Sequence, residues 1–285
     1  MKQFNATPYG VAAFVEQIEP EEPFITIAVI GNFSLRPGGV CQAVLKEAQA
    51  EPQKACFYAD KIGNSRFCDG DVATFKPRAD CLFVGEAHAP GGTPVSFLEV
   101  EFGVGPVRKK LNVFGDRYWV RQPDGAFAIS QPEPFTRKPI RNELAHGGLQ
   151  SEHNKHGIGF GDPEKSNNQP LAVANIVASD RQAVHWSEDE TPAGFGVLPT
   201  DLGVRAKLRG TFDGEWLYRR KPFPPKDFDP AFFNGARADQ QVDGYLAGDE
   251  ELLLKNLHPG HPELRTRLPG TRVRIFVHHI EDHDG

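Results

Sequence analysis

Apolar and polar side chains alternate with a period of two on both sides of Gly105-Pro106. If this dipeptide forms a two-residue hairpin loop, one face of the hairpin is apolar except for Lys109. A one-residue slip would bury Glu101 and Lys110, so the pattern predicts a single register in the core sheet. The predicted pairs are Val104 with Val107, Phe102 with Lys109, Val100 with Leu111 and Leu98 with Val113 on the apolar face, and Gly103 with Arg108, Glu101 with Lys110 and Glu99 with Asn112 on the solvated face.

Further strands are predicted on both sides of this hairpin. Residues 24–35 form a nearly continuous β-branched run, which predicts a buried strand with residues 40–45 as its hairpin partner. Pro123-Asp124-Gly125 favours a tight turn between two short strands, because proline presets φ and glycine tolerates positive φ. The remaining predicted strands are 81–84, 118–121, 126–130, 252–254, 264–268 and 273–277.

The periodicity is lost between residues 131 and 230, where prolines, glycines and polar residues surround isolated aromatics. Disordered segments are poor in aromatic residues, so we expect irregular but packed segments laid over the sheet. Asp229-Pro230 predicts one short helical turn, with the aspartate as its cap and the proline at the first helical position.

Together these patterns predict a mainly β fold in one domain spanning residues 1–285. We expect an antiparallel β-sandwich or barrel-like sheet with long irregular Pro/Gly-rich segments and few short helices. Its predicted parts are strand-rich (1–130), irregular and packed (131–230) and closing strands (231–285). The 29 glycines and 24 prolines among 285 residues agree with a fold that has many turns.

Composition limits the partners that the chain could bind. Its formal net charge of -6 argues against a nucleic-acid-binding surface, which usually shows a basic excess. There is no apolar run of about 18 residues and no secretory leader pattern, so we expect no membrane partner and a cytoplasmic location. The four cysteines show no C-x-x-C spacing and are interpreted as free thiols.

Three histidines that lie close in sequence are the strongest candidate for chemistry. His146, His153 and His156 match no recognised zinc spacing, so we expect exposed loop histidines that do not converge, and no bound metal. The glycine-rich residues 157–161 neither follow a clear strand nor open a helix, which predicts a turn and no cofactor site. Residues 278–284, rich in histidine and aspartate, are interpreted as a solvated chain end. The alternative is a metal-dependent hydrolase built on the three histidines.

An ordered series of motifs points to a known family. The motifs are Phe75-Lys76-Pro77-Arg78-Ala79-Asp80, Gly85, His88-Ala89-Pro90-Gly91-Gly92, Val113-Phe114-Gly115-Asp116-Arg117 with Trp119, Glu133-Pro134-Phe135-Thr136-Arg137, Gly147-Gly148, Gly159-Phe160, Pro192-Ala193-Gly194-Phe195-Gly196, Gly210-Thr211-Phe212-Asp213 with Trp216, Asp227-Phe228-Asp229-Pro230, Phe232-Phe233-Asn234, Asp239-Gln240-Gln241, Asn256-Leu257-His258-Pro259 and Leu268-Pro269-Gly270. In these residues the chain resembles the DUF2169 family, a bacterial family of unknown function found beside type VI secretion spike proteins and their toxic effectors.

The resemblance implies a non-catalytic adaptor, or effector co-chaperone. Such a protein binds a secreted toxin in the cytoplasm and helps load it onto the VgrG-type spike, and no cofactor is implied. Two of the histidines depart from the family pattern, which usually has phenylalanine at the position of His146 and an aliphatic residue at the position of His156. These departures argue against a family-wide metal role for the histidines.

Four residues within the motifs are candidates for holding the toxin. Protein interfaces depend on a few aromatic or arginine anchors, and Arg117, Trp119, Phe135 and Arg137 are of these types. We therefore predict that they form a partner-binding surface. The alternative is that Trp119 belongs to the core and that Arg137 ties the irregular middle segment to the sheet.

Overall fold

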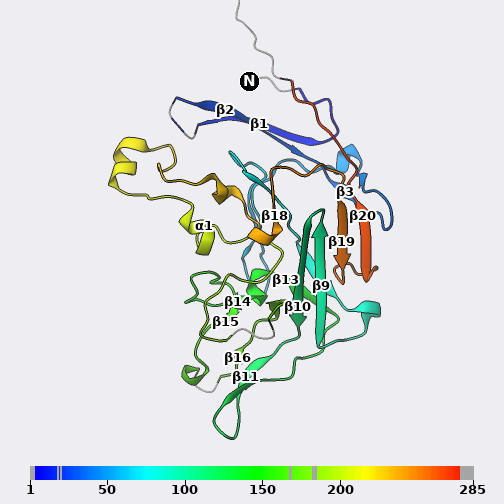
Figure 1. Ribbon diagram of the computed structural model, residues 1–285, viewed down its shortest axis with the longest axis vertical. Coiled ribbons are helices and arrows are strands. Elements are labelled where there is room, and N and C mark those ends of the chain that lie inside the picture. Colours follow the sequence, from blue (N-terminus) through cyan, green and yellow to red (C-terminus); the bar gives the residue numbers. More distant parts are fainter. Residues whose placement is uncertain (1–3, 18, 20, 167–168, 182–184, 277–285) are drawn as a thin grey trace, which may run out of the picture.

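A computed structural model of the chain describes residues 4–17, 19, 21–166, 169–181 and 185–276. At its centre is a five-stranded sheet in which every neighbouring pair of strands is antiparallel (Figure 1). In order across the sheet, the strands are β17 (Ile176–Ala178), β10 (Val107–Phe114), β9 (Phe97–Val104), β19 (Glu251–Lys255) and β20 (Glu263–Arg267). The fold is mainly β, as predicted, and within the described ranges this sheet stays open instead of closing into a barrel.

The hairpin β9–β10 has the predicted register, from Val104 opposite Val107 to Leu98 opposite Val113. Lys109 lies on the apolar face, where its Nζ binds Asp239 Oδ1 at 2.8 Å and Gln240 Oε1 at 3.1 Å. Desolvation lowers the pKa of Lys109 to about 8, although the bond to Asp239 opposes this shift. On the other face Lys110 lies opposite Glu101 in the register, as predicted, but its Nζ forms an ion pair with the diagonal Glu99, at 3.0 Å from Oε1.

A second layer covers the apolar face of the central sheet. β8 (Gly85–His88) and β13 (Arg137–Ile140) form an antiparallel pair, and Ala87 and Ile140 of this pair belong to the same buried cluster as the sheet residues. Phe195, from the irregular middle segment, is fully buried in that cluster. The part of the middle segment around Phe195 therefore packs on the sheet, as predicted, whereas Phe212 of the same segment is exposed.

The N-terminal part differs from the prediction. Residues 24–35 divide into β2 (Pro23–Ile30), which pairs with β1 (Gly10–Gln17), and β3 (Phe33–Ser34), which pairs with β4 (Gln42–Ala43). The prediction of a buried strand was wrong, because in the ribbon β1–β2 only Gly10 is buried. The apolar residues were correctly predicted to form a strand, but apart from Gly10 the side chains of this ribbon are half-buried or exposed.

Most of the remaining strands are two to four residues long. They are β5 (Cys56–Phe57), β6 (Arg66–Cys68), β7 (Arg78–Asp80), β11 (Tyr118–Arg121), β12 (Phe127–Ile129), β14 (His146–Gly147), β15 (Ile158–Gly159), β16 (Leu171–Ala172) and β18 (Gln241–Asp243). The hairpin β11–β12 around Gly125 confirms the predicted turn.

Two predicted strands are absent at the places expected. Residues 81–84 lie between β7 and β8, and their amides bond to loops instead, with Cys81 N donating to Gln240 O and Phe83 N to Phe195 O. No strand occupies residues 273–276, whereas 277 and the histidine- and aspartate-rich residues 278–284 lie outside the described ranges. Strands at 252–254 and 264–267 are confirmed by β19 and β20.

Helical structure is limited to single turns. They are η1 (Lys46–Ala48), η2 (Pro90–Gly92), η3 (Asn142–Leu144), η4 (Pro163–Lys165), α1 (Gly203–Lys207), η5 (Trp216–Arg220), η6 (Pro230–Phe233) and η7 (Ala238–Gln240). Asp229 caps η6 as predicted, because its side chain accepts a hydrogen bond from Ala231 N at 2.8 Å.

Buried arginines hold the irregular segments in place. Arg117 donates to Ala174 O, Arg205 donates to Leu198 O and Phe232 O, and Arg237 donates to Pro192 O and Gly196 O. Each guanidinium satisfies carbonyl groups that have no strand partner, which is the requirement for burying irregular backbone.

All four cysteines are free, as predicted. None of the helices in the described ranges has the length and apolar character that crossing a membrane requires.

Candidate functional site

Two of the four predicted partner-binding residues lie inside the protein. Arg117 is buried, with its guanidinium 3.7 Å from the centre of the Phe114 ring, and burial lowers its pKa to about 10. Phe135 is also buried and is a member of the central apolar cluster. The prediction that Arg117 and Phe135 lie on a surface is therefore corrected. Both side chains are buried and pack inside the protein.

The other two predicted residues remain accessible to different degrees. Trp119 is half-buried on β11 and packs edge-on against Trp186, with ring centres 4.8 Å apart. The side chain of Arg137 is 73% exposed and lies 4.0 Å from Glu86 on the neighbouring strand. The structure therefore does not bring the four residues to one exposed surface, and a partner-binding role for Trp119 or Arg137 stays a prediction.

The three histidines have different environments. His146 is buried, contrary to the expected exposed loop position, and its Nε2 donates to Glu188 O at 2.6 Å. His153 is half-buried and His156 is exposed. In the part of the chain that the structure describes, no three histidine, cysteine, aspartate or glutamate side chains are grouped so that they could hold a metal ion. The geometry therefore gives the hydrolase alternative no assembled metal site.

A charged junction lies where the irregular middle segment meets the N-terminal part. Arg141 forms two parallel bonds to Glu143, from Nε at 2.8 Å and from Nη2 at 2.7 Å, and its guanidinium covers the ring of Tyr58 at 3.6 Å. Ser65 adds two more donors to Glu143, its backbone N at 2.8 Å and its Oγ at 2.7 Å. Burial raises the pKa of Glu143, but the bonds from Arg141 and Ser65 outweigh it and lower the pKa to about 2.

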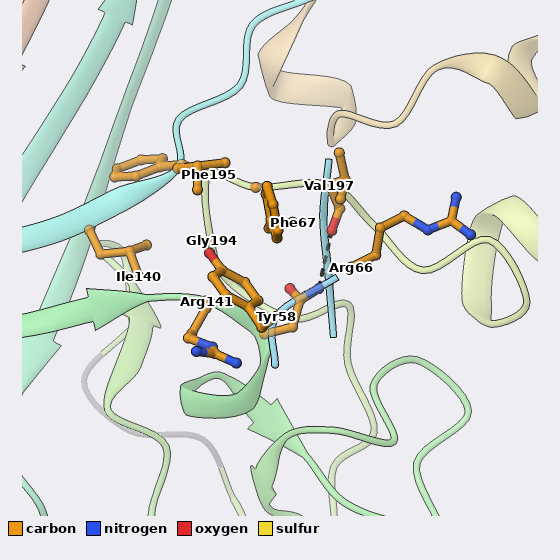
Figure 2. A pocket seen from close by; sticks show the side chains of 11 residues that line it. Tyr58, Arg66, Phe67, Ile140, Arg141, Gly194, Phe195 and Val197 are labelled. Carbon is orange, nitrogen blue, oxygen red and sulfur yellow. Dashed lines mark hydrogen bonds between the residues drawn. The ribbon is translucent and has the colours of Figure 1, made fainter. Parts of the chain in front are cut away.

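Figure 2 shows the hollow beside this junction, where Tyr58 and Phe67 face Ile140 and Phe195. Its volume is about 10 Å³, which is room for about one water molecule. The junction is therefore a packed contact between segments and not a ligand site.

A second feature extends away from the central sheet. We call residues 209–228 the aromatic-basic lobe; they form the yellow and gold segment at the left of Figure 1. Its outer surface carries large apolar and cationic side chains that are solvent-exposed, namely Phe212, Leu217, Tyr218, Arg219 and Lys221. Tyr218 is 85% exposed, which is unusual for so large a ring.

Hydrogen bonds between its two limbs hold the lobe in shape. Asp227 accepts from Thr211 N at 2.9 Å and from Thr211 Oγ1 at 2.7 Å. Trp216 donates its Nε1 hydrogen to Phe223 O at 2.9 Å, and its backbone N donates to Asp213 at 2.8 Å. Between the limbs is a hollow of about 390 Å³ lined by both apolar and charged side chains. The lobe is therefore a framed surface with a concave centre.

Sequence reasoning missed this lobe. The available signal was the run of aromatic residues followed by basic ones in Trp216-Leu217-Tyr218-Arg219-Arg220-Lys221. Exposure of these residues depends on the long limbs of the lobe, and no local pattern predicts that.

Comparison with known proteins gives one result. The profile of a family described as an uncharacterized protein conserved in bacteria matches residues 21–284, nearly the whole chain. The chain belongs to the DUF2169 family. No curated protein and no solved structure gives a significant match.

Many residues that carry the resemblance to the DUF2169 family have packing or framing roles in the structure. A Cβ atom on Gly115 would lie 1.6 Å from Glu133 O, so the two segments can approach only at a glycine. Asp80 accepts from Asn234 Nδ2 at 3.0 Å and from Gly235 N at 2.9 Å. In the aromatic-basic lobe the motif residues form the frame, whereas Leu217 to Lys221 lie outside the motifs.

Proposed function

We propose that this protein is a non-catalytic adaptor that binds a secreted toxin in the cytoplasm and helps load it onto the VgrG-type spike of a type VI secretion system. Support comes from the motifs shared with a family that resembles such adaptors, and from one feature of the structure. That feature is the exposed outer surface of the aromatic-basic lobe.

The lobe has the composition of a protein-binding surface. Tyrosine, tryptophan and arginine are the residue types that dominate binding energy at interfaces. The two aromatic types bury a large area at a small cost in rotamer entropy. Tyr218 and Leu217 offer apolar area, and Arg219 and Lys221 surround them with charge. An apolar centre with a polar rim is the arrangement found in protein interfaces.

Within the lobe, different residues hold its shape and form its exposed surface, which also fits an adaptor. The frame uses motif residues such as Asp227 and Trp216, whereas the exposed surface uses Leu217 to Lys221, which lie outside the motifs, together with the motif residue Phe212.

The test is binding of the toxin encoded beside this gene to purified protein. The double variant Leu217→Ala, Tyr218→Ala should bind the toxin at least about 30-fold more weakly, since interface hot spots contribute about 2 kcal/mol or more. Tyr245 is 88% exposed and lies outside residues 209–228, so Tyr245→Ala is the matched control and should bind like the unmodified protein.

Both variants should keep the melting temperature of the unmodified protein, because the substituted side chains are exposed. Equal affinity of the double variant and the control would place the binding surface elsewhere. Absence of any binding between the unmodified protein and the adjacent toxin would contradict the proposed function itself.

A further inference from the structure

A hollow of about 320 Å³ adjoins the base of the aromatic-basic lobe. We call it the cationic groove. Its lining includes the charged residues Arg66, Asp69, Lys76, Arg205 and Arg209 and the rings of Phe232 and Phe233. These residues come from three distant parts of the chain, and only the fold brings them together.

Positive charge exceeds negative charge in the cationic groove. Asp69 lies between two of the arginines, 2.9 Å from Arg66 Nη1 and 2.9 Å from Arg205 Nη1. Lys76 contacts Asp80 at 2.7 Å. Three of the four cations thus pair with two carboxylates, of which only Asp69 lines the groove, and Arg209 is the fourth cation. The chain as a whole has a formal net charge of -6. The excess of cations lies at one place although the protein as a whole is acidic.

Arg209 provides the most accessible of these charges. Its side chain is exposed and forms no ion pair with any residue in the described ranges. Its guanidinium lies 5.5 Å from the centre of the Phe212 ring, which places the cation at the border between the groove and the lobe. A ligand in the groove can therefore reach the exposed surface of the lobe.

One wall of the cationic groove is apolar. Phe232 and Phe233 are half-buried there, and Val72 is exposed. Arg205 donates two hydrogen bonds to Phe232 O, at 2.9 and 3.0 Å, so this wall is fixed to the buried arginine. Fixed aromatic rings beside cations suit a ligand that has both an acidic and an apolar group.

We propose that the cationic groove binds an acidic segment of the protein partner, with a carboxylate at Arg209 and Lys76 and an adjacent apolar side chain against Phe232 and Phe233. This inference rests on the proposed function and specifies the partner's chemistry. The volume lies at the low end of the range of about 300–1,000 Å³ for ligand sites. It therefore fits a few side chains better than a large cofactor.

A fluorescein-labelled decapeptide of alternating glutamate and phenylalanine is the probe, and its glutamine-for-glutamate counterpart is the reference. The unmodified protein should bind the acidic peptide at least tenfold more tightly than the reference. Arg209→Gln and Lys76→Gln should each weaken binding of the acidic peptide at least fivefold, with the melting temperature measured for each. Arg121→Gln is the control, because Arg121 is exposed on β11 and should leave binding unchanged.

Competitors separate the possible ligands. Inorganic phosphate or a single-stranded oligothymidylate that displaces the peptide at the peptide's own affinity would overturn the inference in favour of a small-anion or nucleic-acid site. Equal binding of the two peptides would overturn it as well. If Arg209→Gln loses folding, Lys76→Gln and the comparison of the two peptides decide the outcome.

The same variants separate this inference from the proposed function. If the adjacent toxin binds the unmodified protein and binds Arg209→Gln and Lys76→Gln equally well, the groove inference fails and the adaptor function stands. If the acidic peptide binds in the groove but the adjacent toxin does not bind at all, the proposed function fails and a peptide-binding groove remains.

Discussion

Glu143 is the most strongly stabilised carboxylate in the junction between the N-terminal part and the middle segment. It is buried and accepts four hydrogen bonds, two from Arg141 and two from Ser65. A buried ion pair of this kind contributes when both partners are present, but removing one partner leaves an uncompensated charge. The stability of the protein should therefore depend on the ionisation of this single side chain.

We expect the free energy of unfolding to fall on acidification because of Glu143. Its folded pKa of about 2 lies below the ordinary value of 4.5, so its contribution is fully present above pH 4.5 and is lost as the pH falls toward 2. The loss should be about 3 kcal/mol, since each pKa unit corresponds to about 1.4 kcal/mol. Urea unfolding between pH 6 and pH 2 measures it.

The variant Glu143→Gln tests whether Glu143 causes the loss of unfolding free energy at low pH. At pH 7 the variant should be less stable by about 3–5 kcal/mol, because the charge of Arg141 is left with Asp60 alone. Its stability should then change less with pH than that of the unmodified protein. The exposed Glu47 supplies the control Glu47→Gln, and a pH dependence identical in all three proteins would contradict the assignment.

At the scale of the elements, the hairpins β1–β2 and β9–β10 both have strands of eight residues but differ in how deeply they are buried. β9–β10 buries one face in the central cluster, whereas β1–β2 leaves Val15 60% exposed and Ile25 43% exposed where they pair. A two-stranded ribbon alone is marginally stable in water, because hydrogen bonds without a buried face barely offset the entropy of ordering the chain. Equal strand lengths therefore do not mean equal stabilities.

Amide hydrogen exchange should separate these two hairpins. We expect the amides of β1 and β2 to exchange at least about a hundredfold faster than those of β9 and β10, since regions with few buried contacts open locally at low free-energy cost. The comparison is internal to one sample, so β9–β10 serves as the reference. Similar protection of both hairpins would mean that something covers the ribbon in solution.

On the scale of the whole molecule, four buried arginines join the middle segment to the sheet and to the N-terminal part. They are Arg117, Arg141, Arg205 and Arg237. Arg237 reaches Pro192 O at 2.6 Å and Gly196 O at 2.7 Å, and burial lowers its pKa to about 10, so it stays charged at neutral pH. A planar guanidinium can bond several carbonyl groups at once, which a lysine ammonium cannot reproduce.

Arg237→Lys should therefore destabilise the protein despite conserving the charge. We expect a loss of about 3–5 kcal/mol in denaturant unfolding, because buried carbonyl groups lose their donors at about 1–3 kcal/mol each. Limited proteolysis should also cut sooner near residues 192–196. Arg121→Lys, on an exposed position, is the control and should stay within about 0.5 kcal/mol of the unmodified protein. If Arg237→Lys left the free energy of unfolding unchanged, the carbonyl contacts would be dispensable.

The sequence alone determined the features that depend on neighbouring residues. Alternation at period two specified the register of β9–β10, Pro123-Asp124-Gly125 specified the next hairpin turn, and Asp229-Pro230 specified the cap of η6. Each of these depends on backbone geometry within a few residues, which side-chain type and spacing directly constrain.

Tertiary structure decided which of these elements are buried and where side chains meet. The β-branched run 24–30 forms a strand in which no residue is buried, and Lys109 contacts Asp239, 130 residues away. The cationic groove likewise assembles Arg66 with Arg209, and the lobe becomes exposed only because its limbs leave the sheet. These outcomes depend on contacts between distant segments, and local periodicity carries no information about which distant segment will supply the partner.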